Sequence, residues 1–169
     1  VSDDMSDGDI YCIFFQIFVS CAAMAKAQLT HNDLHDGNVF VKDMKKVTII
    51  HYYIDGVFYT LKTRYLAFVF DFDRSFSRLL GSNDANNTFL NEVVPERDVW
   101  KILMHSMQKR KDLENFALDT IVASPTDSET RKSVLSILDF GYLETSIDFS
   151  SIKYNNLQKM IKVASEYAN

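Results

Sequence analysis

The sequence predicts a single α+β domain, residues 1–169, that is mainly helical and carries a small antiparallel β-hairpin region. Three observations support this fold class: an apolar run at residues 10–25, two strand-like runs joined by Asp55-Gly56, and helical patterns over most of the C-terminal half. The 169 residues are 47% apolar, which is enough for the core of one domain of ordinary size.

The first expected element is a buried helix through about residue 28. Asp7 and Asp9 stand where an N-cap and first-turn acids belong, just before the run "IYCIFFQIFVSCAAMA". This run is shorter than the roughly 20 residues of a membrane span, and Gln16 lies at its middle. A helix that is apolar on most faces is packed on several sides, so we expect a central core helix.

Charge and cysteine content restrict the setting. The net charge is −5 and no long run of one sign occurs, so neither a nucleic-acid nor a membrane partner is indicated. Cys12 and Cys21 lie nine positions apart in the expected helix, on opposite faces and separated by a rise of about 13 Å, too far for a disulfide. Without a signal-peptide pattern, an intracellular location in cytoplasm or nucleus is expected.

A β-rich region follows the first helix. Asp55-Gly56 in "VTIIHYYIDGVFYTL" is a dipeptide typical of type I′ hairpin turns. The other elements expected in this region are a polar loop at 30–38, a short strand at 39–42, a polar turn "DMKK", a strand at 65–70 and a mobile loop "GSNDANN". Further helices are expected near 97–109, 112–122, 128–139 and 151–167.

Polar residues at two strand ends suggest a metal site. If the strand that leaves Asn38 pairs antiparallel with the strand that enters Asp71, these two residues are cross-strand neighbours about 5 Å apart. Asp33 lies five residues before Asn38 and reaches the same pocket. Two carboxylates and a carboxamide suit Mg²⁺, which prefers oxygen ligands and binds together with phosphate.

The same residues carry a resemblance to protein kinases. "HNDLHDGN" resembles the catalytic loop H-R-D-L-x-x-x-N, and "DFD" stands where kinases have D-F-G. The likeness is closest to haspin-like atypical serine/threonine kinases, in which the loop also runs into an added hairpin before an Asp without a following Gly. Kinases of large DNA viruses share these features. The resemblance covers residues 9–107 and implies a kinase C-terminal lobe, whereas 108–169 is weakly matched and expected only to be helical.

The resemblance implies roles for four side chains in phosphoryl transfer. Asp33 is expected to accept the proton of the attacking hydroxyl. Asn38 and Asp71 are expected to hold the metal ions that bridge the ATP phosphates. His35 occupies the position from which kinases offer a cation to the transferring phosphate.

Two further residues are expected to support the loop, and two positions depart from the kinase pattern. His31 braces the loop, and Asp98 in "ERDVWKILM" accepts hydrogen bonds from the loop backbone, by resemblance to kinase helix F. Asn32 replaces the loop Arg, which argues against switching by phosphorylation. Asp73 replaces the Gly of D-F-G; its expected contact is a surface ion pair with Arg74, and the metal is the alternative partner.

A kinase also needs an N-terminal lobe over the nucleotide, with a Gly-rich loop and a strand Lys. None of the five glycines forms G-x-G, and Lys26 is the only lysine before the loop. We therefore expect this lobe to be absent from the chain. Binding of Mg²⁺ and ATP is expected only with such a lobe present, and the expected partners are a protein substrate and a separate N-terminal lobe or partner chain.

Three functions remain open. The first is the catalytic lobe of a haspin-like serine/threonine kinase that transfers the ATP γ-phosphate to a protein hydroxyl and is incomplete or inactive alone. The second is a non-catalytic, kinase-derived scaffold, or a component of a viral particle, in a host cell or virion. The third is a small-molecule phosphotransferase of the choline or aminoglycoside kinase kind, which also uses "DLHxGN"; the hairpin argues against it.

Overall fold

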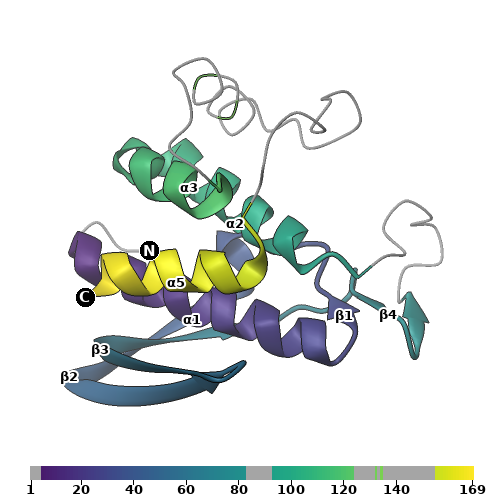
Figure 1. Ribbon diagram of the computed structural model, residues 1–169, viewed down its shortest axis with the longest axis horizontal. Helices are drawn as coiled ribbons and strands as arrows, with labels where there is room; N and C mark the ends of the chain where they lie inside the picture. The colour runs from purple at the N-terminus through teal and green to yellow at the C-terminus, as the bar shows by residue number, and fades with distance from the viewer. Residues whose placement is uncertain (1–4, 83–92, 124–131, 133, 135–154) are drawn as a thin grey trace.

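The computed structural model describes residues 5–82, 93–123, 132, 134 and 155–169, and it confirms the α+β class (Figure 1). The helices are α1 (Asp7–Lys26), α2 (Pro95–Lys109), α3 (Glu114–Ile121) and α5 (Leu157–Ala168), with short 3-10 turns η1 (Asp36–Asn38) and η3 (Lys111–Leu113). The strands are β1 (Leu29–Thr30), β2 (Val39–Ile54), β3 (Val57–Val69), β4 (Phe76–Ser77) and β5 (Gly81–Ser82). β2 and β3 form an antiparallel two-stranded ribbon, and β4 pairs with both β1 and β5 in a small antiparallel sheet.

The start of α1 differs by one residue from the expected cap. Ser6, not Asp7 or Asp9, is the N-cap. Its hydroxyl accepts a hydrogen bond from the Asp9 backbone N–H at 3.2 Å, and the Asp9 carboxylate accepts one from the Ser6 N–H at 3.3 Å. This reciprocal pair is a capping box, which satisfies two donors that have no partner within the helix.

α1 is the central helix, as predicted, and lies between α5 and the ribbon (Figure 1). Phe15 packs against Tyr52 and Tyr59 of the ribbon, with ring centroids 5.3 and 5.5 Å away. Phe14 packs on the other side against Phe116 of α3. Among the described helices, α1 alone is long and apolar enough to cross a membrane by length and composition; here its apolar side chains form the domain core.

A polar side chain, that of Gln16, lies in the middle of this core. Its side-chain amide donates hydrogen bonds to the Cys12 and Tyr65 carbonyls at 3.1 and 2.9 Å, and its carbonyl oxygen accepts one from the Ala67 N–H at 3.1 Å. A buried amide is tolerated when its donors and acceptor are satisfied. Gln16 therefore fastens α1 to β3.

The ribbon is longer and more continuous than expected. The predicted turn "DMKK" is instead an irregularity within β2, where the register shifts between Asp43 and Thr48. Asp43 accepts hydrogen bonds from the Arg64 guanidinium at 2.8 and 2.7 Å and from the Lys45 backbone N–H at 2.7 Å. These contacts, led by the hydrogen bond from Arg64, hold the pKa of Asp43 far below its usual range, and they stabilise a bulge where a reversal of the chain was expected.

The type I′ turn at the ribbon tip is confirmed. Asp55 and Gly56 both have positive φ, 48° and 84°, which this turn type requires. The Asp55 carboxylate pairs with Lys26 at 2.6 Å and accepts a hydrogen bond from Gln158 at 3.2 Å. The tip is thereby attached to the end of α1 and the beginning of α5.

Most other expected elements occur with shifted ends. α2 begins at Pro95, α3 follows η3 and ends at Ile121, and α5 begins at Leu157 after the N-cap Asn156. Both cysteines are free and buried. Most of the expected helix at 128–139, the segment 151–154 and the polar stretch 83–87 lie outside the described residues.

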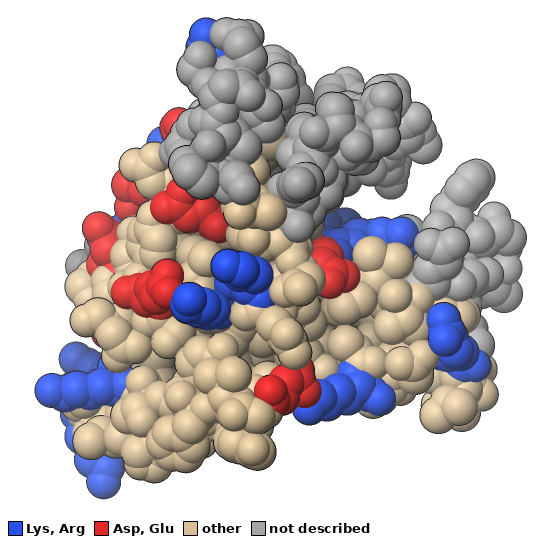
Figure 2. Space-filling model, viewed as in Figure 1, with Lys and Arg blue, Asp and Glu red and all other residues tan. Residues whose placement is uncertain are grey.

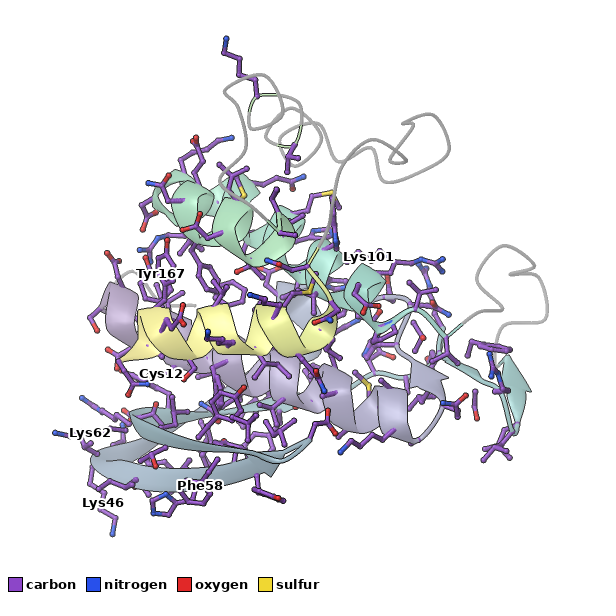
Figure 3. All side chains as sticks on the ribbon, viewed as in Figure 1. Cys12, Lys46, Phe58, Lys62, Lys101 and Tyr167 are labelled. Carbon is purple, nitrogen blue, oxygen red and sulfur yellow. The ribbon has the colours of Figure 1, made fainter. Side chains whose placement is uncertain are left out.

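The outer face of the ribbon exposes several large apolar side chains among polar and charged ones such as Lys62. Phe40 and Phe68 are cross-strand partners there with rings 6.3 Å apart, and Phe58 is 64% exposed. Figure 2 shows Lys and Arg gathered at the lower left, where Figure 3 labels Lys46 and Lys62, and a mostly uncharged surface along the ribbon. These exposed apolar side chains are not part of the core.

Two phenylalanines test this description of the ribbon. Phe15 is 1% exposed and joins α1 to the ribbon, whereas Phe58 is 64% exposed on the outer face. Phe15→Ala should lower the free energy of unfolding by about 3–5 kcal/mol, because a large core side chain is lost. Phe58→Ala should change it by less than about 0.5 kcal/mol. Urea denaturation of both variants measures the difference, and equal losses would contradict the packing described.

Candidate active site around the loop 31–38

The loop at residues 31–38 is held from below by a buried carboxylate. Asp98 on α2 is 1% exposed and accepts hydrogen bonds from the backbone N–H groups of His31 and Asn32, at 2.8 and 2.9 Å. This is the contact expected of Asp98 from the sequence. Burial raises the pKa of Asp98, while the two backbone donors oppose that rise. The carboxylate thus bears a desolvation cost in order to hold the loop.

His31 links the loop to the end of β3. Its ring is fully buried; Nδ1 accepts a hydrogen bond from the Asp33 N–H at 3.3 Å, and Nε2 lies 2.9 Å from the Phe70 carbonyl. The first contact makes Nδ1 an acceptor, so Nε2 is the nitrogen that donates to Phe70. The ring also packs 4.8 Å from Phe72. His31 therefore holds together the two segments that carry Asp33 and Asp71.

Asn38 and Asp71 lie at the same end of the ribbon, but they are not directly opposite each other. Val39 pairs with Val69, and the Phe70 N–H donates to the Asn38 carbonyl at 3.1 Å. Asn38 therefore faces Phe70, and Asp71 is one residue further than the expected pairing placed it. The buried Asn38 side chain donates to the Asp33 carbonyl at 2.9 Å. This bond fixes the amide nitrogen and leaves the amide oxygen as the possible metal ligand.

The Asp33 carboxylate is surrounded by cations. Oδ1 lies 3.2 Å from Lys101 Nζ and 3.6 Å from Arg74 Nη1, and Oδ2 lies 3.8 Å from His35 Nε2. Partial burial tends to raise the pKa of Asp33, but the hydrogen bond and charge of Lys101, with Arg74 and His35, outweigh it and hold the pKa below its usual value. The group is ionised at neutral pH. Arg74, which the sequence suggested as a partner of Asp73, lies beside Asp33 instead.

Gly37 allows His35 to sit close against the loop. The His35 Nδ1 accepts a hydrogen bond from the Gly37 N–H at 3.0 Å, and a Cβ on Gly37 would come within 2.8 Å of the imidazole ring. A side chain at this position would therefore displace the ring. The glycine in "DGN" is explained by this close approach.

α2 presents a row of polar side chains to the loop, most of which the sequence analysis missed. Besides Asp98, Lys101 contacts Asp33, the His105 ring lies 5.4 Å from the His35 ring, and Lys109 pairs with Asp36. Spacings of three and four residues place all of them on one helix face. Burial and the nearby His35 lower the pKa of His105. The signal that could have found this row was its spacing from Asp98.

Two residues of the site adopt a backbone conformation that is uncommon outside glycine. Asn32 and Asp71 have φ of 66° and 62°. Such conformations cost free energy and persist when surrounding contacts enforce them. For Asn32 those contacts are Asp98 on its N–H and Lys101 on its carbonyl oxygen, at 2.9 and 2.7 Å.

The donor atoms available to a cation are oxygens. Asn38 supplies an amide oxygen and the exposed Asp71 a carboxylate, a set that suits Mg²⁺ better than a soft metal. Within the described residues, no three His, Cys, Asp or Glu side chains gather into a metal-binding group. A cation held here would have few protein ligands, so phosphate or water oxygens would have to complete its coordination.

Replacement of Asp98 should damage the loop far more than replacement of Asp33. Asp98→Ala leaves two buried N–H groups without an acceptor, at about 1–3 kcal/mol each. Asp33→Asn removes only a partly exposed ion pair, which contributes roughly 0–1 kcal/mol. Thermal unfolding of both variants against the unchanged chain makes the comparison, and equal melting temperatures would reject the supporting role of Asp98.

Comparison of the chain with protein-family models, with curated proteins and with solved structures found no match. The side chains of this site, and the two sequence motifs that carry them, are therefore the features that bear on function.

Proposed function

We propose that this chain is the catalytic lobe of a haspin-like serine/threonine protein kinase and transfers the γ-phosphate of ATP to a protein hydroxyl. The observation that carries the proposal is the convergence of Asp33, Asn38 and Asp71 at one end of the ribbon, around a loop whose backbone Asp98 holds. A charged carboxylate beside a pair of oxygen ligands is what phosphoryl transfer needs from a protein.

Asp33 acts in this proposal as the proton acceptor. The substrate oxygen forms a bond to the γ-phosphorus, the bond from phosphorus to the bridging oxygen of ADP breaks, and the hydroxyl proton passes to the Asp33 carboxylate. An ionised carboxylate is required, and the surrounding cations keep Asp33 in that state. His35 Nε2 lies 3.8 Å from Oδ2; because Nδ1 accepts the Gly37 N–H, the ring would have to give up that bond before it could offer a positive charge.

Asn38 and Asp71 hold the metal in this proposal. Mg²⁺, when bound, neutralises phosphate charge during transfer. The hydrogen bond from Asn38 to the Asp33 carbonyl at 2.9 Å couples the metal side of the site to the proton acceptor. Backbone pairing of Asn38 with Phe70 fixes the position of Asp71, the next residue along the chain.

A nucleotide bound at this site also needs protein on the side opposite the loop 31–38. The ribbon exposes an aromatic surface that suits contact with such a partner. The 169 residues contain no G-x-G, so a phosphate-covering loop must come from an N-terminal lobe in another segment or chain. Phe40 and Phe68 form an exposed aromatic pair on the ribbon, next to Asn38 in sequence and pairing. We assign this pair to contact with the nucleotide or with that lobe, in an intracellular or virus-infected setting.

A second candidate is a non-catalytic scaffold, including a component of a viral particle. The exposed apolar face of the ribbon favours it, because such faces bind other proteins. Its members are Phe40, Val47, Ile49, Tyr53, Phe58 and Phe68. Under this hypothesis the ribbon binds a partner and the Asp33 site is inherited without use.

Weak divalent-cation binding is expected at Asn38 and Asp71, since two oxygen donors remain while the phosphates that complete the shell are missing. Titration with Mn²⁺ should broaden the NMR signals of residues near these positions, and Asp71→Asn should reduce the effect. Asp112→Asn, a carboxylate remote from the loop and paired with Arg110, is the matched control. Broadening confined to residues 3–9 would contradict the proposed site.

Transfer itself should depend on a supplied N-terminal lobe. The chain alone should incorporate no measurable phosphate from labelled ATP, because nothing in it orients the triphosphate. Once a parent or partner protein with an intact Gly-rich loop and Lys is added, transfer to a protein substrate should appear. Asp33→Asn in that complex should lower the rate by a factor on the order of 10² to 10⁴.

The control for this assay is Asp36→Asn, which removes a carboxylate of the same loop that pairs with Lys109 and takes no part in the proposed chemistry. Strong activity of the isolated chain would contradict the need for a second lobe. A complex that binds ATP but transfers nothing would favour the scaffold.

A further inference from the structure

Lys101 is the most closely engaged cation at Asp33, and nothing in the loop motif assigns it a role. It lies three residues after Asp98 on α2, so both side chains extend from the same helix face toward the loop. Figure 3 labels it on this helix. One turn of α2 thus supplies an anion to the loop's backbone donors and a cation to its acceptors.

The Lys101 ammonium makes two contacts with adjacent residues. Nζ donates to the Asn32 carbonyl at 2.7 Å and to Asp33 Oδ1 at 3.2 Å. The first bond holds a residue of positive φ, and the second holds the carboxylate that follows it. Because both contacts come from one group, the orientation of the Asp33 side chain is coupled to the strained backbone of Asn32.

The other two cations are less suited to fix the carboxylate. Arg74 is 3.6 Å from Oδ1, and its side chain is 62% exposed, against 27% for Lys101. His35 is 3.8 Å from Oδ2, beyond hydrogen-bond distance, and an imidazole carries charge only when protonated. Lys101 is therefore the permanent charge that is both closest and least solvated.

We propose that Lys101 is a positioning residue: it holds Asp33 Oδ1 against α2 and so leaves Oδ2, on the side of His35, as the oxygen that accepts the substrate proton. This inference rests on the proposed phosphoryl transfer for its purpose. Under this proposal the cation that supports Asp33, the proton acceptor, comes from α2 and not from the loop 31–38.

The decisive experiment is an NMR titration of the Asp33 carboxyl carbon in the isolated chain. Lys101→Gln keeps an N–H donor but removes the charge, so the Asp33 midpoint should rise by roughly 0.5 to 1 pH unit. Lys101→Arg keeps the charge and should restore the original midpoint. Lys109→Gln removes a cation of the same helix that pairs with Asp36; it should move the Asp36 midpoint and leave that of Asp33 unchanged.

A merely structural role for Lys101 predicts a different pattern. In that case Lys101→Gln would disturb the backbone amide signals of residues 31–38. Lys101→Arg, even with intact amide signals, would show the same Asp33 midpoint as Lys101→Gln. That pattern, or equal Asp33 midpoints in the unchanged chain and Lys101→Gln, overturns the proposal.

An activity measurement separates this inference from the proposed function. In an active complex with an N-terminal lobe, Lys101→Gln should lower kcat roughly 10-fold with little change in KM, since positioning acts in the transition state. The acid limb of its pH profile should move upward with the Asp33 midpoint. Absence of transfer from every complex would count against the kinase proposal, whereas the NMR midpoints alone decide whether Lys101 holds Asp33.

Discussion

The candidate site depends on one buried carboxylate. Asp98 binds two successive backbone N–H groups of the loop, and one of them belongs to Asn32, whose left-handed conformation leads directly into Asp33. Burial opposes the charge on Asp98, but removal of the carboxylate would leave both backbone donors unpaired. The hydroxyl of Thr30, which accepts a hydrogen bond from the Val94 N–H at 3.0 Å, adds a second attachment just before α2.

The remaining architecture brings the ribbon to this fixed loop. α1 supplies an apolar surface for β3, and Gln16 aligns the two through bonds to Tyr65 and Ala67. The register of β3 then determines where the strand ends, at Val69, and His31 binds the next carbonyl, that of Phe70. Asp71 follows in a left-handed conformation, which turns the chain away from the ribbon at the residue proposed to bind metal. The core helix α1 and Asp71, the residue proposed to bind metal, are in this way parts of one chain of contacts.

The sequence predicted what local chemistry determines. Asp55-Gly56 has few conformations other than a tight hairpin turn, and an all-apolar helix must be buried, so both were predictable. The polar run "DMKK" predicts a turn but forms a bulge at Asp43, because polar residues fit either and the contact with Arg64, distant in sequence, decides between them. Asn38 and Asp71 were misaligned by one residue because strand register depends on packing against α1. Lys101 was missed since its partner lies 68 positions away and a surface lysine has no pattern of its own.

Positive side chains gather at Asp33, and two exposed carboxylates follow the end of β3. Lys101 of α2 and Arg74, the residue after Asp73, lie beside Asp33, whereas Asp71 and Asp73 are exposed. A phosphoryl group between them would meet oxygen ligands for its metal on one side and positive charge on the other, with the proton acceptor held ionised by the same cations. The aromatic pair Phe40 and Phe68 borders the metal side and is left uncovered by the described residues. Under the proposed function, this exposed pair is the surface that an N-terminal lobe or a bound nucleotide would cover, next to the end of the ribbon that carries Asn38 and Asp71.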